Sequence, residues 1–361
     1  MKIKRNSILF KTYINCKNLR FRYIALAILF MVLACPVLNL CNARVAFAYD
    51  GPLLKGFNLA GAEFGSKILP GKEGTNYFWP KAADVKMYAS AGATILRIPF
   101  KWERMQPTLY LPLEKSELNH LDTIIREAKK ENVLIILDPH NYGNYRGNII
   151  GSMKTPTDAF LNFWKRLATY YKNTPQVVFG LMNEPHSHSA KDWAYIVQKC
   201  IWSIRGTGAK QLILVPGTRW SGAHSWLSGN KSNADALKNI FDPENNFMFE
   251  VHQYLDKRSS GTESLCVNEN IGIKRLEGIT KWLRKNKQKA FLGEFGIANN
   301  QLCLNSMDNM LKYIEKNSDA WGGWTYWAGS KYFGKYMFNI YPADSSVFPQ
   351  FKILQKYMKN K

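Results

Sequence analysis

Short apolar runs alternate with longer amphipathic stretches along the chain after residue 49. The runs are rich in β-branched residues, a pattern typical of buried strands. Eight such runs occur, at 54–59, 94–99, 133–137, 177–182, 212–215, 247–251, 290–294 and 323–327. We therefore expect eight strands, separated by segments long enough to hold helices.

The stretches between the runs have the period of an α-helix. In segment 117–130, one helical stripe collects the apolar side chains, namely Leu118, Leu121, Ile124, Ile125 and Ala128. Segments 158–171, 191–205, 271–285 and 306–316 behave similarly. Eight strand–helix units predict an α/β fold, a single-domain (β/α)₈ TIM barrel. A doubly wound sheet is the alternative, but no glycine-rich dinucleotide loop follows the first strand.

Polar and aromatic residues stand at or just after the ends of these runs. They are Arg97, His140, Asn183, Glu184, Trp220, His252, Tyr254, Glu294 and Trp327. In a parallel barrel, the C-terminal ends of the strands converge on one mouth. Because a buried charge is costly unless it is paired or hydrogen-bonded, several such groups at one rim predict a shared network.

Glu184 and Glu294 are the candidate catalytic residues. Cleavage of a glycosidic bond needs one carboxyl group that protonates the leaving oxygen and a second that attacks the anomeric carbon or activates water. The two glutamates close the fourth and seventh runs, so the barrel would place them across its mouth from each other. We assign Glu184 as the acid/base and Glu294 as a carboxylate kept ionised by Arg97 and Tyr254. The residues alone leave retention or inversion open.

Four motifs resemble those of glycoside hydrolase family five. Asn-Glu-Pro at 183–185 is similar to the acid/base motif of its clan, and Gly-Glu-Phe-Gly at 293–296 to the nucleophile motif. Leu-Arg-Ile-Pro at 96–99 and Asp-Pro-His-Asn-Tyr at 138–142 match the motifs of strands two and three. The resemblance covers essentially all of residues 50–361 and implies a retaining barrel glycosidase.

A closer similarity is to the secreted endo-β-1,4-glucanase branch of that family. It rests on Gly-Phe-Asn-Leu-Ala-Gly at 56–61, Asn-Glu-Pro-His at 183–186 and Val-His-Gln-Tyr-Leu-Asp at 251–256. The branch implies hydrolysis of internal bonds of a β-glucan by double displacement, with Glu294 as the nucleophile and no cofactor. It also implies a disulfide between Cys266 and Cys303.

The resemblance further implies which residues bind the substrate. The substrate-binding set that we expect is Arg97, His140, Asn183, Trp220, His252, Tyr254 and Trp327. Asn183 would bond the sugar 2-hydroxyl, and Trp327 would stack beneath the sugar at the cleavage subsite, which His140 and His252 would line. Trp220 would be an outlying platform. Stacking fits the apolar face of a pyranose.

Residues 1–48 have the features of an export signal. They carry eight basic residues and no acidic one, contain an apolar stretch at 24–37 and end in an Ala-x-Ala cleavage signature. The stretch is shorter than the about 20 apolar residues of a membrane span. We expect a catalytic domain at 49–361 that is secreted without stable membrane association. A lipoprotein signal at 32–35 is the alternative.

The formal net charge is +22, and 41 Lys and Arg against 27 Asp and Glu remain after residue 48. Such a charge could attract nucleic acid, but the basic residues are scattered and no nucleic-acid motif accompanies them. We therefore expect no nucleic-acid partner. His186 and His188 lack the further ligands of a zinc site, so we expect no metal. We also expect a monomer.

Two other functions stay open on the residues alone. Another retaining β-glycanase, acting on mannan, xylan or mixed-linkage glucan, would use the same two glutamates, because loop contacts decide specificity. A carbohydrate-binding barrel without turnover is the alternative from another class, and the two intact carboxylates argue against it.

Overall fold

The computed structural model describes residues 51–341 and 348–358, which belong to one compact unit. The predicted export signal lies outside the described residues. In the described part of the chain, no helix combines the length and the apolar character needed to cross a bilayer. The described residues all lie within the predicted catalytic domain.

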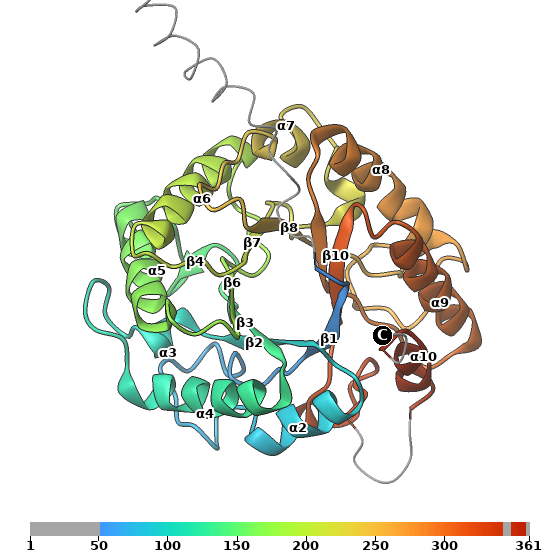
Figure 1. Cartoon of the computed structure of the whole chain (residues 1–361), viewed down its shortest axis with the longest axis horizontal. Helices are drawn as coiled ribbons and strands as arrows, with labels where there is room; N and C mark the ends of the chain where they lie inside the picture. Colours follow the sequence, from blue (N-terminus) through green and yellow to red (C-terminus); the bar gives the residue numbers. More distant parts are fainter. Residues whose placement is uncertain (1–50, 342–347, 359–361) are drawn as a thin grey trace, which may run out of the picture. The chain divides into compact units, whose positions relative to one another are not determined.

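Eight parallel strands close into a barrel within the described residues, which confirms the predicted single-domain (β/α)₈ fold (Figure 1). The strands are β1 (Leu54–Asn58), β2 (Ile95–Phe100), β3 (Leu134–Pro139), β6 (Val177–Gly180), β7 (Ile213–Pro216), β8 (Phe247–His252), β9 (Ala290–Glu294) and β10 (Trp321–Tyr326). Their order around the barrel is β1-β10-β9-β8-β7-β6-β3-β2. Each barrel strand therefore lies beside the barrel strands that precede and follow it in the sequence, and β10 closes the barrel against β1.

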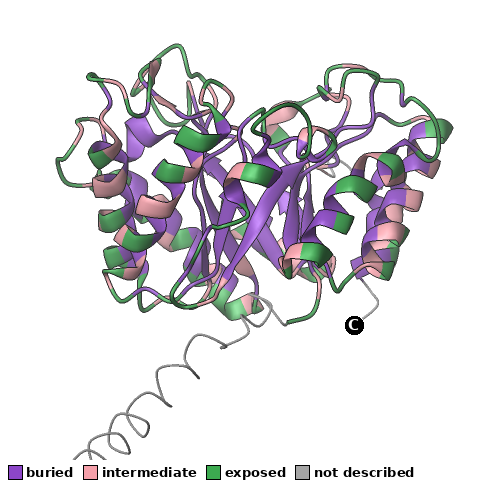
Figure 2. Ribbon diagram, turned by 90° about the horizontal axis from the view of Figure 1, so that it is seen from above, coloured by how far each residue is buried: buried purple, intermediate pink, exposed green. Residues whose placement is uncertain are grey.

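The helices form a ring outside the strands (Figure 1). They are α2 (Ala82–Ser90), α3 (Trp102–Met105), α4 (Lys115–Glu131), α5 (Thr157–Tyr171), α6 (Ala190–Arg205), α7 (Asn233–Leu237), α8 (Ile271–Asn286), α9 (Gln301–Lys316) and α10 (Pro349–Met358). The five predicted helices correspond to α4, α5, α6, α8 and α9. Each turns a buried face inward and an exposed face to solvent (Figure 2), as amphipathic periodicity requires. A short hairpin, β4 (Asn144–Tyr145) and β5 (Asn148–Ile149), stands in the loop after β3.

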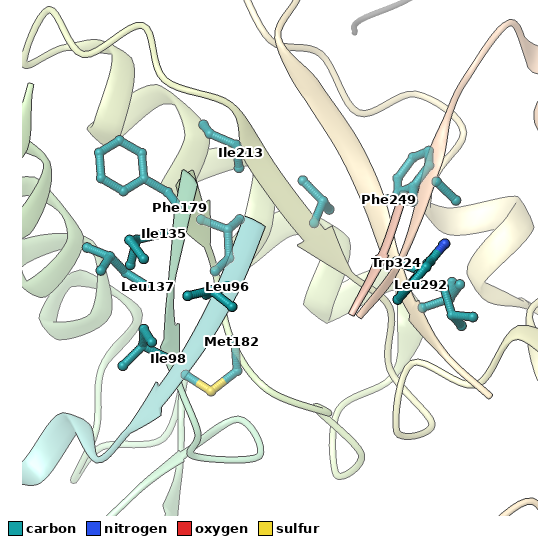
Figure 3. Close-up of a cluster of buried hydrophobic side chains, with 14 of the residues drawn as sticks. Leu96, Ile98, Ile135, Leu137, Phe179, Met182, Ile213, Phe249, Leu292 and Trp324 are labelled. Atoms are coloured by element: carbon teal, nitrogen blue, oxygen red, sulfur yellow. The ribbon is translucent and has the colours of Figure 1, made fainter. Parts of the chain in front are cut away.

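Along each barrel strand, apolar side chains point alternately into the barrel and outward against the helices, which gives two apolar layers. Ile95 and Ile136 belong to one buried cluster, whereas Leu96 and Ile135 belong to the larger cluster shared with the helices (Figure 3). Successive side chains of a strand point to opposite faces, so Arg97 lies on the same face as Ile95. The same alternation aims the charged residues at the strand ends into the barrel mouth, above an apolar floor.

A disulfide joins Cys266 and Cys303, with an S–S distance of 2.00 Å and Cα atoms 5.3 Å apart. It is the pair that the family resemblance implies. The bridge connects the loop after β8 to the first turn of α9, so it fixes the chain on both sides of the strand that carries Glu294. Cys200 on α6 is buried and has a free thiol.

Candidate active site

The structure brings the two candidate carboxylates together. Glu184 follows β6 and Glu294 ends β9, yet a carboxylate oxygen of each and a ring nitrogen of His252 all lie within 4.8 Å of one another. Glu184 adopts a left-handed backbone conformation with φ of 41°, which is uncommon for a residue with a side chain. Such strained positions concentrate at functional sites, where the surrounding structure maintains them.

Two donors hold Glu294. Arg97 donates from Nη1 to Oε1 at 2.8 Å, and the Tyr254 hydroxyl donates to Oε2 at 2.8 Å. Only 5% of the Glu294 side chain is exposed. The two hydrogen bonds, one to each oxygen, fix the orientation of this carboxylate. Arg97 and Tyr254 thus lie where the assignment from the sequence puts them.

His252 lies between the two glutamates. Its Nδ1 is 2.7 Å from Glu184 Oε1 and 3.6 Å from Glu294 Oε2, and its Nε2 is 3.4 Å from Glu250 Oε1. Burial alone would lower the pKa of this imidazole, but the charge of Glu294 and the contacts with Glu184 and Glu250 raise it to about 10. His252 therefore carries a positive charge at neutral pH and can donate from both nitrogens.

His140 has the opposite character. Burial lowers its pKa well below the usual value, so the ring is neutral. Its Nδ1 lies 2.8 Å from Asp138 Oδ2, and its Nε2 lies 3.1 Å from the Asn183 side-chain nitrogen. A neutral ring satisfies both contacts when Nδ1 donates and Nε2 accepts. The Asn183 side-chain oxygen in turn accepts from Arg97 Nη2 at 2.9 Å, which fixes the orientation of the amide.

Arg97 connects these groups. Its guanidinium is fully buried and lies 3.1 Å from Asp138, 3.0 Å from Glu250 and 2.8 Å from Glu294. Burial would lower its pKa, but these three acids raise it above the ordinary value. It also donates to Asn58 at the end of β1. One arginine therefore links strand ends from opposite sides of the barrel into one network.

Three members of this network were given no role in the site from the sequence, although Asp138 opens the motif at 138–142. Asn58, Asp138 and Glu250 are all buried and contact Arg97. Glu250 stands inside an apolar run, and a charge in such a run is the signal that would have identified it. Its carboxylate occupies space left by Gly293, where an added Cβ would lie 2.3 Å from Glu250 Oε1.

The two expected aromatic platforms lie in different places. Trp327 is half-buried and stacks on His140, with ring centroids 5.5 Å apart and an interplanar angle of 18°. Trp220 is 55% exposed and stacks on His186 with centroids 4.7 Å apart. Trp327 thus lies beside the network of charged residues around Glu294, whereas Trp220 lies at the exposed edge of the barrel mouth.

A cavity of about 460 Å³ extends from Glu184 toward Trp220. We call it the Glu184-side cavity, and its lining is Glu184, Arg219, Trp220, Gly222, His224, Ser225, His252, Tyr254, Arg258, Ser259 and Ser260. Its wall contains the acid/base candidate and an exposed aromatic ring, which is the composition expected of a sugar-binding cleft.

Glu184, His252 and Glu294 also have the spacing of three metal ligands. A metal requires a neutral histidine with a free lone pair. The carboxylate neighbours raise the pKa of His252 to about 10 despite burial, so a metal ion would have to displace a proton from this ring. The site therefore fits a proton-based mechanism better than a metal-based one.

Comparison with known proteins agrees with this geometry. Residues 55–330 match the family model described as cellulase (glycosyl hydrolase family 5). Endo-β-1,4-glucanase A of Emericella nidulans is 38% identical over 305 residues, which cover 84% of this chain and 91% of that protein.

Solved structures are similar as well. The structure of XacCel5A in complex with cellopentaose is 48% identical, with a TM-score of 0.83 over 84% of this chain and 98% of that chain. The endoglucanase Cel5A of Pseudomonas stutzeri in complex with cellobiose is 36% identical, with a TM-score of 0.79 over 85% of this chain and 92% of that chain. With the family model and these relatives in agreement, the chain belongs to glycosyl hydrolase family 5, the cellulase family of glycoside hydrolases.

Proposed function

We propose that this protein is a retaining endo-β-1,4-glucanase in which Glu184 is the acid/base and Glu294 the nucleophile. The observation that carries the proposal is the approach of the two carboxylates, whose oxygens lie within 4.8 Å. Retaining glycosidases place these groups about 5–5.5 Å apart, whereas inverting enzymes leave about 6.5–9.5 Å for a water molecule. The names of the relatives, endo-β-1,4-glucanase and endoglucanase, support the substrate class.

In the first step, Glu294 attacks the anomeric carbon and forms a glycosyl ester. The bond between that carbon and the leaving oxygen breaks, and Glu184 gives its proton to the oxygen. Arg97 and Tyr254 each bind a different oxygen of Glu294, so they orient it for attack. The protonated His252, 2.7 Å from Glu184, holds the acid/base side chain in place.

In the second step, water attacks the same carbon and the ester bond breaks. Glu184, now a carboxylate, takes a proton from that water, and Glu294 leaves as an anion. The two displacements at one carbon give net retention. Because His252 stays positively charged, it stabilises the negative charge that returns to Glu294, 3.6 Å away.

The remaining expected residues have positions suited to substrate contact. Asn183 is held by Arg97 and His140, so its amide can present a fixed hydrogen bond to the sugar 2-hydroxyl. Trp327 can stack beneath the sugar that is attacked, and Trp220 beneath a sugar on the leaving side. Each stacking surface covers the apolar face of a pyranose.

The proposal is tested by NMR of the products during hydrolysis of a soluble β-1,4-glucan. We expect the β-anomer to form first and the α-anomer to appear only by mutarotation. Initial release of the α-anomer would overturn the retaining mechanism. A panel of soluble polysaccharides addresses the substrate, because tenfold greater activity on β-mannan would favour another β-glycanase. Protein that binds glucan without cleaving it would favour the carbohydrate-binding alternative.

We also propose that the enzyme is exported, that its signal is removed after residue 48, and that it acts as a monomer outside the cell. Two fungal relatives are named endo-β-1,4-glucanase and endoglucanase. These names support a protein that acts on polymeric glucan outside the cell. N-terminal sequencing of the protein from culture medium tests the cleavage position, and light scattering during size-exclusion chromatography tests the monomer.

A further inference from the structure

Two arginines stand in the wall of the Glu184-side cavity. Arg219 is exposed, and its Nη1 donates to the Ser228 carbonyl oxygen at 2.8 Å. An arginine has five N–H donors, so the bond to Ser228 leaves most of those of Arg219 available for a ligand. Arg258 is 82% exposed and has one loose partner, Glu263, at 3.8 Å.

The residues that line the cavity carry little negative charge to balance these two cations. Glu184 is the one acid in its lining, and it serves the reaction. The nearby Asp256 is buried and accepts hydrogen bonds from Ser260 and from the Gly261 backbone, so its carboxylate already has partners. The wall between Trp220 and Arg258 therefore presents an excess of positive charge to a bound chain.

The position of Arg219 is set by an unusual backbone. Arg219, Trp220 and Ser221 follow one another in left-handed conformation, with φ of 58°, 54° and 53°. Each such residue costs free energy, so a run of three persists only where the surroundings enforce it. The Trp220 amide is tied to the Pro185 carbonyl beside Glu184 at 3.1 Å. The segment thus holds Arg219 and Trp220 next to the acid/base.

We propose that the leaving-group half of the cleft binds β-1,4-glucan that carries carboxylate groups, such as chains containing uronic acid or C6-oxidised glucose units. The proposal rests on the proposed function, because Glu184 as the acid defines which half holds the leaving group. A guanidinium recognises a carboxylate through paired N–H donors, and Trp220 supplies the apolar surface for the ring that carries it. The 41 Lys and Arg against 27 Asp and Glu that follow residue 48 give a net charge of the sign that attracts a polyanion.

The test compares a partly C6-oxidised soluble β-1,4-glucan with the same polymer after its carboxylates are converted to methyl esters. The measured quantity is the ratio of kcat/KM on the two polymers. We expect the wild-type ratio to exceed one at low ionic strength and to fall toward one in about 0.5 M NaCl, since salt screens exposed charges. The double variant Arg219→Gln/Arg258→Gln should lower the low-salt ratio about tenfold. This is the effect expected when two exposed arginine–carboxylate pairs between protein and substrate are lost.

Two further variants separate charge from structure. Arg219→Lys/Arg258→Lys keeps both charges and should retain most of the preference for the oxidised polymer. Arg126→Gln/Lys129→Gln removes two exposed charges on α4, outside the cleft, and should leave the ratio at the wild-type value. Equal ratios in the wild type and the Arg219→Gln/Arg258→Gln variant would overturn the inference while hydrolysis of the methyl ester still upholds the proposed function. Wild-type protein that cleaves neither polymer would overturn both.

Discussion

The hydroxyl of Tyr254 donates a 2.8 Å hydrogen bond to Oε2 of Glu294, the oxygen not bound by Arg97. Tyr254 lies in the loop after β8 and is 8% exposed, so the bond forms in a largely dry environment. Each oxygen of the proposed nucleophile thus has its own donor. The carboxylate plane is consequently fixed before substrate arrives, which lowers the cost of reaching the attack geometry.

Tyr254→Phe should therefore lower kcat on soluble β-glucan about 10- to 100-fold, the usual range for loss of a hydrogen bond to a charged group. Tyr170→Phe is the control, because the hydroxyl of Tyr170, an exposed residue of α5, donates a 2.7 Å bond to Asp122 of α4, away from the site. Steady-state kinetics on both variants measure the change in kcat, and circular dichroism verifies that each variant is folded. An unchanged kcat for Tyr254→Phe would show that Arg97 alone suffices to position Glu294.

Glu184→Gln should separate the two catalytic roles. A glucan needs its leaving oxygen protonated, so this variant should lose about 10²- to 10⁴-fold in kcat/KM on the polymer. An aryl cellobioside with an acidic phenol leaves without protonation, so the first step on that substrate should be far less affected. Glu294→Gln should lose activity on both substrates, because no ester can form.

Burst kinetics of phenol release provide the readout. In Glu184→Gln the second step still lacks its base, so a rapid burst followed by slow turnover is expected. Equal losses on glucan and aryl cellobioside in Glu184→Gln would contradict the acid/base assignment.

Glu63 makes stability depend on pH. Burial raises the pKa of this carboxyl from its ordinary value of 4.5 to about 8, although the Gly61 amide and the charge of Lys101 act to lower it. A raised pKa means that the folded state binds the proton more tightly. The contribution to stability is complete below about pH 4.5 and is lost as the pH rises through 8, at about 1.4 kcal/mol per pH unit between the two values.

Glu63→Gln should remove this dependence, because a neutral amide can accept the same 2.7 Å bond from Gly61 without acquiring charge. Relative to wild type, the variant should gain unfolding free energy steadily from pH 5 to pH 8, as measured by denaturant unfolding. Glu277→Gln, at an exposed position of α8, supplies the comparison for a simple change of net charge. Parallel stability profiles for wild type and Glu63→Gln would contradict the assignment.

The barrel was predictable because apolar runs and helical stripes recur in strict alternation. The runs at 94–99 and 133–137 correspond to β2 and β3 within two residues at each end. Helices α2 and α10 were not predicted, since each is short, at nine and ten residues, and gives few repeats of the helical period. In α2, the buried residues are Asp84, Val85 and Tyr88, which gives too little periodicity to recognise.

The site too was predictable in part: most of its members could be predicted from the sequence, but the contacts between them could not. Its expected members end strands, and a parallel barrel brings strand ends together whatever their separation in the sequence. The contacts between them were not predictable, because they depend on side-chain geometry across the mouth. Glu250 illustrates the limit: it stands within an apolar run, and its contacts with Arg97 at 3.0 Å and with His252 at 3.4 Å explain why a charge is tolerated there.

The disulfide between Cys266 and Cys303 should contribute stability without taking part in catalysis. It closes a loop with a sequence separation of 37, for which the chain-entropy model gives about 4 kcal/mol at 25 °C. That loop contains α8 and β9, so the bridge restricts the unfolded chain on both sides of Glu294. Neither cysteine contacts the carboxylate network, and the folded geometry of the site is maintained by Arg97 and Tyr254.

Cys266→Ala/Cys303→Ala should accordingly lower the midpoint of thermal unfolding by about 6 °C for a domain of this size, while kcat at 25 °C stays within about twofold. Cys200→Ala is the matched control for loss of sulfur, since that thiol is buried but unbridged. A reducing agent should destabilise the wild type and leave the double variant unaffected. If reduction abolished activity at temperatures where circular dichroism still reports a folded barrel, the bridge would be part of the catalytic geometry, and its assignment as a stabilising constraint would be wrong.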